Sequence, residues 1–175
     1  MFVFALFCIP TAIYLVVARK SADAPTVMGL RLPSGPGWAW SAALVAVGLG
    51  LGWLGTRAVP ADVLHGAGTT GTITSAVAAV AVVFRAVGEE VFFRGFLQGL
   101  AARHWGAWWG IGLSAVAFLL PHLFLLAVST ALAPLVAAQF VIGLALAWIR
   151  QRTASIWPGA LAHVLTNLAT GLLPL

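Results

Sequence analysis

Long apolar runs, separated by short polar stretches, constrain the fold of this chain more than any other feature of its sequence. The first run covers residues 1–17, and others begin at 38, 107 and 132. Runs of this kind are close to the length that a helix needs to cross the hydrocarbon core of a bilayer. Hydrophobic residues make up 62% of the sequence and charged residues only 7%, which leaves too little polar surface for a water-soluble globule. The sequence therefore excludes a soluble or disordered chain and predicts an all-α membrane helix bundle.

We expect about six transmembrane helices within one integral membrane domain over residues 1–175. Their approximate ranges are 1–17, 38–56, 71–103, 107–128, 132–149 and 155–175. The stretches 21–37 and 57–70 contain charges and several prolines or glycines, so we expect them to form loops. At about 1.5 Å per residue the third helix would extend about 50 Å, so it must tilt, bend or leave the ~30 Å hydrocarbon core.

Glycines recur within the predicted helices. Gly88, Gly95 and Gly99 lie in the long third helix and are the expected places for a bend. Small residues four positions apart also allow two helices to approach closely. This spacing is found in the pairs Gly48–Gly52, Gly95–Gly99 and Gly106–Gly110, for which we expect close helix packing.

Basic residues gather in alternate loops, at the ends of the apolar runs. One predicted side of the membrane carries Arg19, Lys20, Arg31, Arg103, Arg150 and Arg152. Cytoplasmic loops of membrane proteins have an excess of arginine and lysine, so we expect this side to be cytoplasmic. The net charge of +5 is then a topology signal, and no basic cluster predicts a nucleic-acid site. The composition, rich in Ala, Gly, Arg and Trp, favours a bacterial source and hence a bacterial plasma membrane.

Two adjacent carboxylates, Glu89 and Glu90, lie inside an otherwise apolar helix. A charged group at the bilayer centre costs about 2.5–3.5 kcal/mol on insertion scales, and such residues are functional-site candidates by default. Glu90 and Arg94 are four residues apart, so they share one helix face and are expected to pair. Glu89 points about 100° away from Glu90 and stays available as a general base, unless Arg85 competes for it. A structural ion pair that locks two helices together is the alternative interpretation.

Two histidines and an asparagine also lie inside the predicted spans. His122 follows Pro121 in the fourth helix, and His163 and Asn167, four residues apart, share a face of the sixth. Counted from the basic ends, Glu89 and His122 lie about 21 and 24 Å along their helices. His163 and Asn167 lie only about 12 and 18 Å along theirs. We therefore expect Glu89 and His122 to converge, with a less close match for the residues of the sixth helix.

These residues form three motifs that together resemble those of a known family. The segment from Glu89 to Arg94 is similar to the EExxxR motif of the CPBP family, which comprises type II CAAX-processing endopeptidases and bacteriocin-processing or immunity proteins. The segments from Phe118 to His122 and from His163 to Asn167 resemble its FxxxH and HxxxN motifs. The similar, motif-bearing region covers about residues 79–169. Each motif alone has little specificity, but all three in order on successive helices are specific.

The resemblance implies a glutamate-dependent intramembrane endopeptidase that works without a metal or other cofactor. It implies that Glu89 and His122 polarise a water for attack on a peptide carbonyl, while the Glu–Arg pair of the first motif orients the site. His163 and Asn167 would stabilise the oxyanion, a role that needs hydrogen-bond donors aimed at the developing charge. The expected partners are a peptide or membrane-protein substrate and the lipid bilayer, the active site is expected to open toward the cytoplasm, and no oligomeric state is predicted.

Three other functions are compatible with the same residues. A zinc protease needs three or four His, Glu or Asp ligands; the HExxH motif is absent, but Glu89, His122 and His163 could form such a site. A serine protease would use Ser114, whose Gly-Leu-Ser-Ala sequence faintly resembles that of rhomboid proteases, although a small packing residue is the favoured interpretation. A membrane scaffold or immunity protein would keep the motif residues for structure alone.

Overall fold

The computed structural model describes residues 2–67 and 73–172, and every regular element in that part of the chain is helical. The long helical stretches are α1 (Phe2–Val17), α3 (Gly35–Arg57), the run from α5 to α6, the run from α7 to α8, α9 (Ala133–Thr153) and α10 (Trp157–Leu172). Among the described residues, three stretches are long and apolar enough to cross a membrane, at 35–57, 107–128 and 130–153. The predicted all-α membrane bundle is confirmed, although the expected helix start at Gly71 lies outside the described residues.

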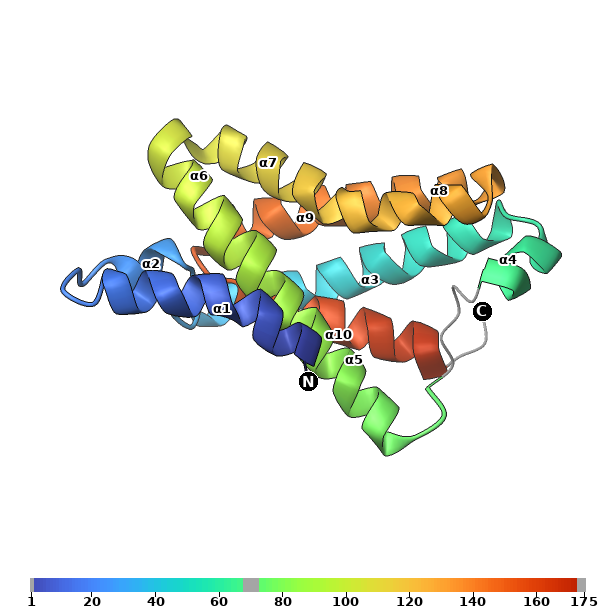
Figure 1. Cartoon of the computed structure of the whole chain (residues 1–175), viewed down its shortest axis with the longest axis horizontal. Helices are drawn as coiled ribbons and strands as arrows, with labels where there is room; N and C mark the ends of the chain where they lie inside the picture. Colours follow the sequence, from blue (N-terminus) through green and yellow to red (C-terminus); the bar gives the residue numbers. More distant parts are fainter. Residues whose placement is uncertain (1, 68–72, 173–175) are drawn as a thin grey trace.

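The helix that carries the glutamate pair is not uniform. It consists of α5 (Ala76–Glu90), the π-helical segment η1 (Val91–Leu97) and α6 (Gln98–Trp105), which follow one another without a break. The sequence predicts a bend at a glycine, but the structure shows that the helical run widens into a π-helix directly after Glu89 and Glu90. Such π segments occur often at functional sites. Figure 1 shows the run crossing the bundle obliquely, which is how its length is accommodated.

Side chains from two other helices bond to the backbone of η1. The hydroxyl of Thr11 in α1 donates to the carbonyl of Val91 at 3.2 Å, and the hydroxyl of Ser114 donates to the carbonyl of Phe93 at 2.9 Å. Both hydroxyls are buried. Because buried carbonyls need partners, these two bonds satisfy backbone groups at the point where the helix changes type. They also attach α1 and the helix of Ser114 to the segment next to the glutamates.

The fourth predicted span is interrupted at its proline. It consists of α7 (Ala107–Leu119), the short 3₁₀ helix η2 (Leu120–Leu123) and α8 (Phe124–Val128), and η3 (Thr130–Leu132) leads into α9. Pro121 lies in η2 and has no backbone N–H to donate, so a tighter turn replaces the regular α-helical ladder there. His122 is thereby placed on this tightened turn.

Short helices occupy both stretches that the sequence predicts as loops: α2 (Ala24–Val27) in the first and α4 (Ala61–Ala67) in the second. Pro25 stands in the first turn of α2, where a missing N–H costs nothing. The guanidinium of Arg150 donates to the carbonyl of Val27 at 2.8 Å, and the indole of Trp157 donates to the carbonyl of Leu30 at 2.8 Å. The first of these stretches is therefore held against the basic end of the bundle.

Close helix packing at the paired glycines is confirmed only in part. A Cβ atom on Gly48 would lie 3.0 Å from Oγ1 of Thr166, and one on Gly110 would lie 2.9 Å from a neighbouring side chain. For Gly52 and Gly106 the expectation is wrong, because nothing lies within 4 Å of the position that a Cβ would take. Gly106 serves the turn between α6 and α7 instead, since its φ of +94° is one that L side chains rarely adopt.

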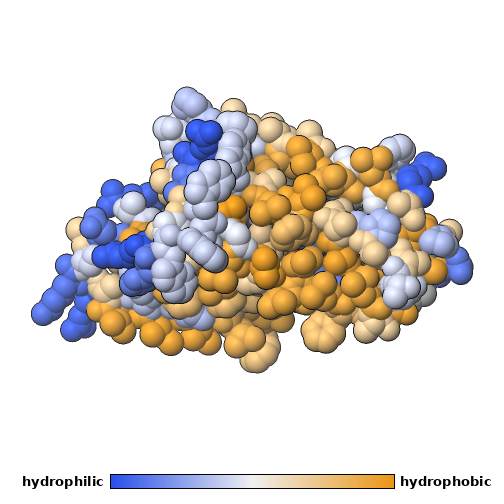
Figure 2. All heavy atoms as spheres, turned by 90° about the horizontal axis from the view of Figure 1, so that it is seen from above, coloured by the Kyte–Doolittle hydropathy of each residue, from blue (hydrophilic) through white to orange (hydrophobic). Residues whose placement is uncertain are grey.

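The packing of the bundle places α10 at its centre, between α3 and α5, while α9 packs against α3 and α7 (Figure 1). A cluster of buried side chains joins α3, α9 and α10: Leu44, Leu146, Ile149 and Ala162. Large apolar side chains such as Val116 and Phe124 face outward. Figure 2 shows a broad apolar band on the face in view, between two more polar ends. A surface of this kind is stable in lipid, so the chain is an integral membrane protein.

Candidate active site

The predicted pairing of Glu90 with Arg94 is confirmed. Nη1 of Arg94 lies 3.0 Å from Oε1 of Glu90, and both side chains are almost completely buried. The guanidinium also donates to the carbonyl of Gly143 at 3.2 Å and lies over the ring of Phe118, 4.2 Å from its centroid. Three interactions, one from each of three helices, therefore fix this arginine, and with it the orientation of Glu90. A buried pair of this kind is fixed in position rather than available for reaction.

His163 joins the two glutamates. Its Nδ1 lies 3.0 Å from Oε1 of Glu90, and its Nε2 lies 3.7 Å from Oε2 of Glu89. The imidazole of α10 thus stands between two adjacent carboxylates of α5. The structure brings His163 closer to the glutamates than the depths counted from the helix ends predict, because the run from α5 to α6 crosses α10 obliquely.

The two glutamates are not equivalent, as the helical geometry predicts. The side chain of Glu89 is 17% exposed, whereas that of Glu90 is 1% exposed. Arg85 does approach Glu89, but at 3.8 Å and with a side chain that is 56% exposed. An exposed pair at this distance holds its carboxylate only loosely. Glu89 is therefore the carboxylate that has freedom to act on another molecule.

His122 lies beside this cluster and is oriented by its own helix. Its Nδ1 is 2.9 Å from the carbonyl oxygen of Phe118. A carbonyl oxygen only accepts, so Nδ1 carries the hydrogen, and in the neutral ring Nε2 keeps its lone pair. The rings of His122 and His163 lie 4.9 and 5.9 Å from the ring of Phe118, measured between centroids. His122 is also close enough to interact electrostatically with Glu89. Phe118 is thus the shared contact of both histidines and Arg94.

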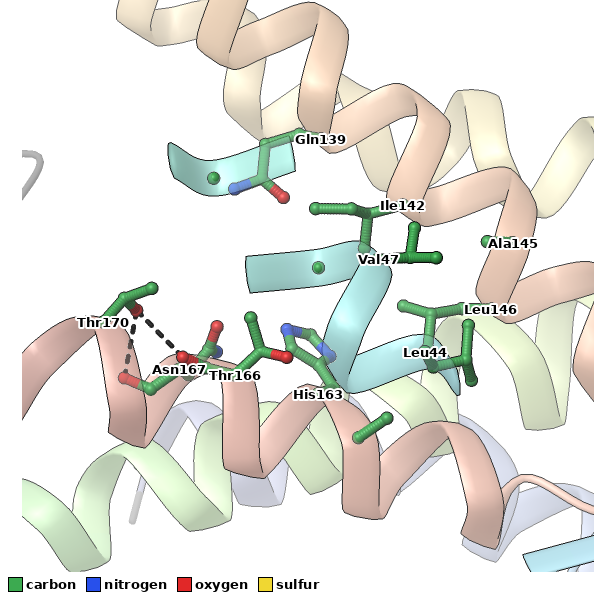
Figure 3. A pocket seen from close by; sticks show the side chains of 13 residues that line it. Leu44, Val47, Gln139, Ile142, Ala145, Leu146, His163, Thr166, Asn167 and Thr170 are labelled. Atoms are coloured by element: carbon green, nitrogen blue, oxygen red, sulfur yellow. Dashed lines mark hydrogen bonds between the residues drawn. The ribbon is translucent and has the colours of Figure 1, made fainter. Parts of the chain in front are cut away.

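Asn167 lies in a cavity on the other side of His163, which we call the α3–α10 groove. Its walls include Val47, Gly48 and Gly52 of α3, Gln139 of α9, and His163 and Asn167 of α10 (Figure 3). The cavity volume is about 90 Å³, enough for several water-sized groups. Glu89 and His122 do not line this groove. We call Glu89, Glu90, Arg94, His122 and His163 together the carboxylate cluster. His163 is therefore the residue that connects this cluster to the cavity.

Two residues near the glutamates, Gln98 and Gly159, were not identified from the sequence. Gln98 is buried and donates to the carbonyl of Ala147 at 2.7 Å. Gly159 lies against Glu90, because a Cβ there would be 3.4 Å from Oε2 of that residue. Ser114 is fully buried and bonded to the backbone of η1, which favours the packing interpretation over a nucleophile. A signal for Gly159 could have been its position four residues before His163, which puts both on one helix face.

No group of three or more His, Cys, Asp or Glu side chains within residues 2–67 and 73–172 has the geometry to hold a metal ion. The ad hoc zinc site considered from the sequence, with Glu89, His122 and His163 as ligands, is therefore not formed by the described residues. The cluster presents instead one loosely held carboxylate, two imidazoles and a fixed ion pair. This set of groups can accept, hold and return a proton next to a cavity.

Comparisons with known proteins identify the family. A family model described as Type II CAAX prenyl endopeptidase Rce1-like matches residues 72–169, which include all three motifs. Neither the curated proteins nor the solved structures with which the chain was compared include a match. The matched region covers more than half of the chain and agrees with the motif-bearing region expected from the sequence. The chain belongs to the type II CAAX prenyl endopeptidase Rce1-like family of the CPBP proteins, and it is a membrane protease at the level that this family defines.

Proposed function

We propose that this protein is an intramembrane endopeptidase in which Glu89 activates a water for attack on a peptide carbonyl. The observation that carries the proposal is that the two glutamates differ in exposure and in how firmly each is paired. Glu90 is fixed by Arg94, whereas Glu89 is partly exposed and held only loosely. A general base must be able to reach the proton that it removes, and only Glu89 meets that requirement. His122 would hold the same water through the lone pair on Nε2.

The reaction uses the cluster as follows. Glu89 takes a proton from the water as the water oxygen bonds to the carbonyl carbon, which places negative charge on the carbonyl oxygen. His163 and Asn167 donate hydrogen bonds to that oxyanion. The C–N bond then breaks, and Glu89 returns the proton to the leaving amine. The net reaction adds one water across one peptide bond, and no cofactor takes part.

The donor role of His163 depends on its protonation. With Nδ1 directed at Glu90, a neutral ring would have its hydrogen there and none on Nε2. An imidazolium ring can donate from both nitrogens, and the two flanking carboxylates supply the opposite charge. We propose that His163 acts in this charged form, which makes the group of Glu89, Glu90, Arg94 and His163 neutral overall.

We propose further that the protein lies in a bacterial plasma membrane with its basic ends in the cytoplasm and acts on a peptide or membrane protein. The α3–α10 groove extends from His163 toward Gln139, in the half of α9 that is farther from Arg150 and Arg152, and toward Gly52, in the half of α3 that ends at Arg57. A cytoplasmic opening would therefore reach His163 from the opposite direction. Labelling of single cysteines from each side of sealed vesicles tests this orientation.

The proposed function is tested by Glu89→Gln and His122→Asn in vesicles. The family description names a prenylated CAAX sequence, and the probe is therefore a peptide that ends in a farnesylated cysteine and three further residues, two of them aliphatic. Loss of a general base typically lowers turnover by about 10²–10⁴-fold, and we expect losses of that size with unchanged unfolding. An undiminished rate in Glu89→Gln would sink the mechanism. If a cellular function of the protein survives loss of both residues, the scaffold interpretation takes its place.

A further inference from the structure

Two side-chain amides of the α3–α10 groove have no hydrogen-bond partner in the described part of the chain. Among the described residues, neither the amide of Gln139 nor that of Asn167 makes a hydrogen bond. The two residues come from different helices, α9 and α10, and Figure 3 shows their side chains on facing walls of the groove. Both side chains are partly buried, and an unpaired amide is costly where water is scarce, as it is within the span of a membrane. A bound group with hydrogen-bonding atoms would satisfy both amides.

The shape of the groove comes from the glycines of α3. At Gly48 the helix lies against α10, because a Cβ there would be 3.0 Å from Oγ1 of Thr166. One turn later, at Gly52, nothing lies within 4 Å of the same position. The surfaces of α3 and α10 therefore meet at Gly48 and separate at Gly52. The absent side chain of Gly52 leaves space in the groove rather than serving helix contact.

We propose that the α3–α10 groove holds an extended segment of the peptide substrate, with Gln139 bonding its backbone and Gly52 leaving room for one of its side chains. This inference rests on the proposed function and names the part of the protein that selects the substrate. A primary amide has one acceptor and two donors, which match the C=O and N–H of a peptide unit. Much of the remaining wall is apolar, including Val47 and Ile142, and suits an aliphatic side chain. The groove is continuous with His163, so a peptide in it reaches the carboxylate cluster.

Gly52→Leu tests the space, and Gly50→Leu is its matched control. Both glycines lie in α3 and have nothing within 4 Å, but Gly50 is exposed and does not line the groove. Both changes raise helix propensity equally, so neither is expected to impair folding. Binding of the fluorescently labelled farnesylated peptide is measured in the Glu89→Gln background, where no turnover interferes. We expect Gly52→Leu to raise Kd at least about tenfold and Gly50→Leu to change it less than about twofold.

Gln139→Leu tests the polar contact, and Gln151→Leu, on the same helix but outside the groove, is its control. Loss of one neutral hydrogen bond corresponds to a rise in Kd of about two- to tenfold. A purely structural glutamine would lower the unfolding midpoint when replaced. Removal of an unpartnered amide from an apolar wall should leave that midpoint unchanged or raise it. Weaker binding without lower stability is therefore the signature of a substrate contact.

The possible outcomes distinguish failure of the groove proposal from failure of the proposed function. If the peptide does not bind, or if Gly52→Leu binds it as tightly as Gly50→Leu does, the groove proposal is overturned. A lower unfolding midpoint in Gln139→Leu with unchanged binding overturns the role of Gln139. If the peptide binds and Gly52→Leu abolishes binding, but the protein with Glu89 intact does not cleave it, the groove is supported and the proposed function fails.

Discussion

Replacement of Arg94 by leucine should destabilise the protein far more than replacement of Arg85 by leucine. The two arginines lie on the same helical run, and each pairs with a glutamate four residues away. Their surroundings differ. The side chain of Arg94 is fully buried and 3.0 Å from Glu90, whereas that of Arg85 is 56% exposed and 3.8 Å from Glu89. The comparison therefore isolates the effect of burial on one type of ion pair.

The magnitude follows from the contacts of Arg94. At an effective dielectric constant of about 20, two unit charges 3.0 Å apart attract each other by about 5 kcal/mol. Loss of one partner leaves a buried carboxylate uncompensated, which typically costs about 3–5 kcal/mol. The bond to Gly143 and the contact with Phe118 are lost as well, whereas His163 stays beside Glu90 and offsets part of the charge. We expect Arg94→Leu to cost about 3–5 kcal/mol, and Arg85→Leu less than about 1 kcal/mol.

The free energy of unfolding is measured by titration of mixed micelles with a denaturing detergent, followed by circular dichroism. Arg94→Lys keeps the positive charge but loses the planar fork and the stacking on Phe118, so its cost should lie between those of the two leucine variants. Equal costs for Arg94→Leu and Arg85→Leu, or a cost below about 1 kcal/mol for Arg94→Leu, would refute the reasoning that burial makes this pair essential to the fold.

Two further predictions concern the packing around η1 and α2. Ser114→Ala should destabilise the protein by about 1–3 kcal/mol, because the buried carbonyl of Phe93 loses its hydrogen-bond donor. Turnover per folded molecule should stay within a few-fold of that of the unchanged protein. Lost turnover with an unchanged free energy of unfolding would instead indicate a serine mechanism. Gly99→Ala places a Cβ against the carbonyl of Val27 and should speed proteolysis of residues 18–34, whereas Gly112→Ala, with nothing within 4 Å, should not. Equal proteolysis of the two would contradict this packing.

The main helices and the Glu90–Arg94 pair could be predicted because each depends on local pattern. Apolar runs define the spans, and a separation of four residues defines a shared helix face. The approach of His163 to both glutamates could not be predicted with the same certainty. Depth counted along a helix assumes parallel axes that start at one level, and the oblique run from α5 to α6 violates that assumption (Figure 1). The motifs indicated the convergence that counting residues did not.

The π-helical segment and the open space at Gly52 could not be predicted from the sequence, for a different reason. Both depend on contacts between residues far apart in the chain. The segment η1 is bonded by Thr11 and Ser114, which are 80 and 21 residues from their acceptors. The spacing of Gly48 and Gly52 is the same as in closely packed helices, and only the path of α10 decides that the first glycine is in contact and the second is not. No local pattern carries that information.

The family match and the site together suggest how chemistry and selectivity are divided in this chain. The matched residues 72–169 contain the glutamates, both histidines and the asparagine, and thus the whole carboxylate cluster. The α3 wall of the groove, with Gly48 and Gly52, lies outside that region, and so does Thr11, which bonds to η1. The proposed catalytic groups therefore depend on helices that the match does not include. Changes in α3 should alter which peptide is accepted and leave unchanged the groups proposed to activate water, because only His163 and Asn167 belong to both the groove and the proposed reaction.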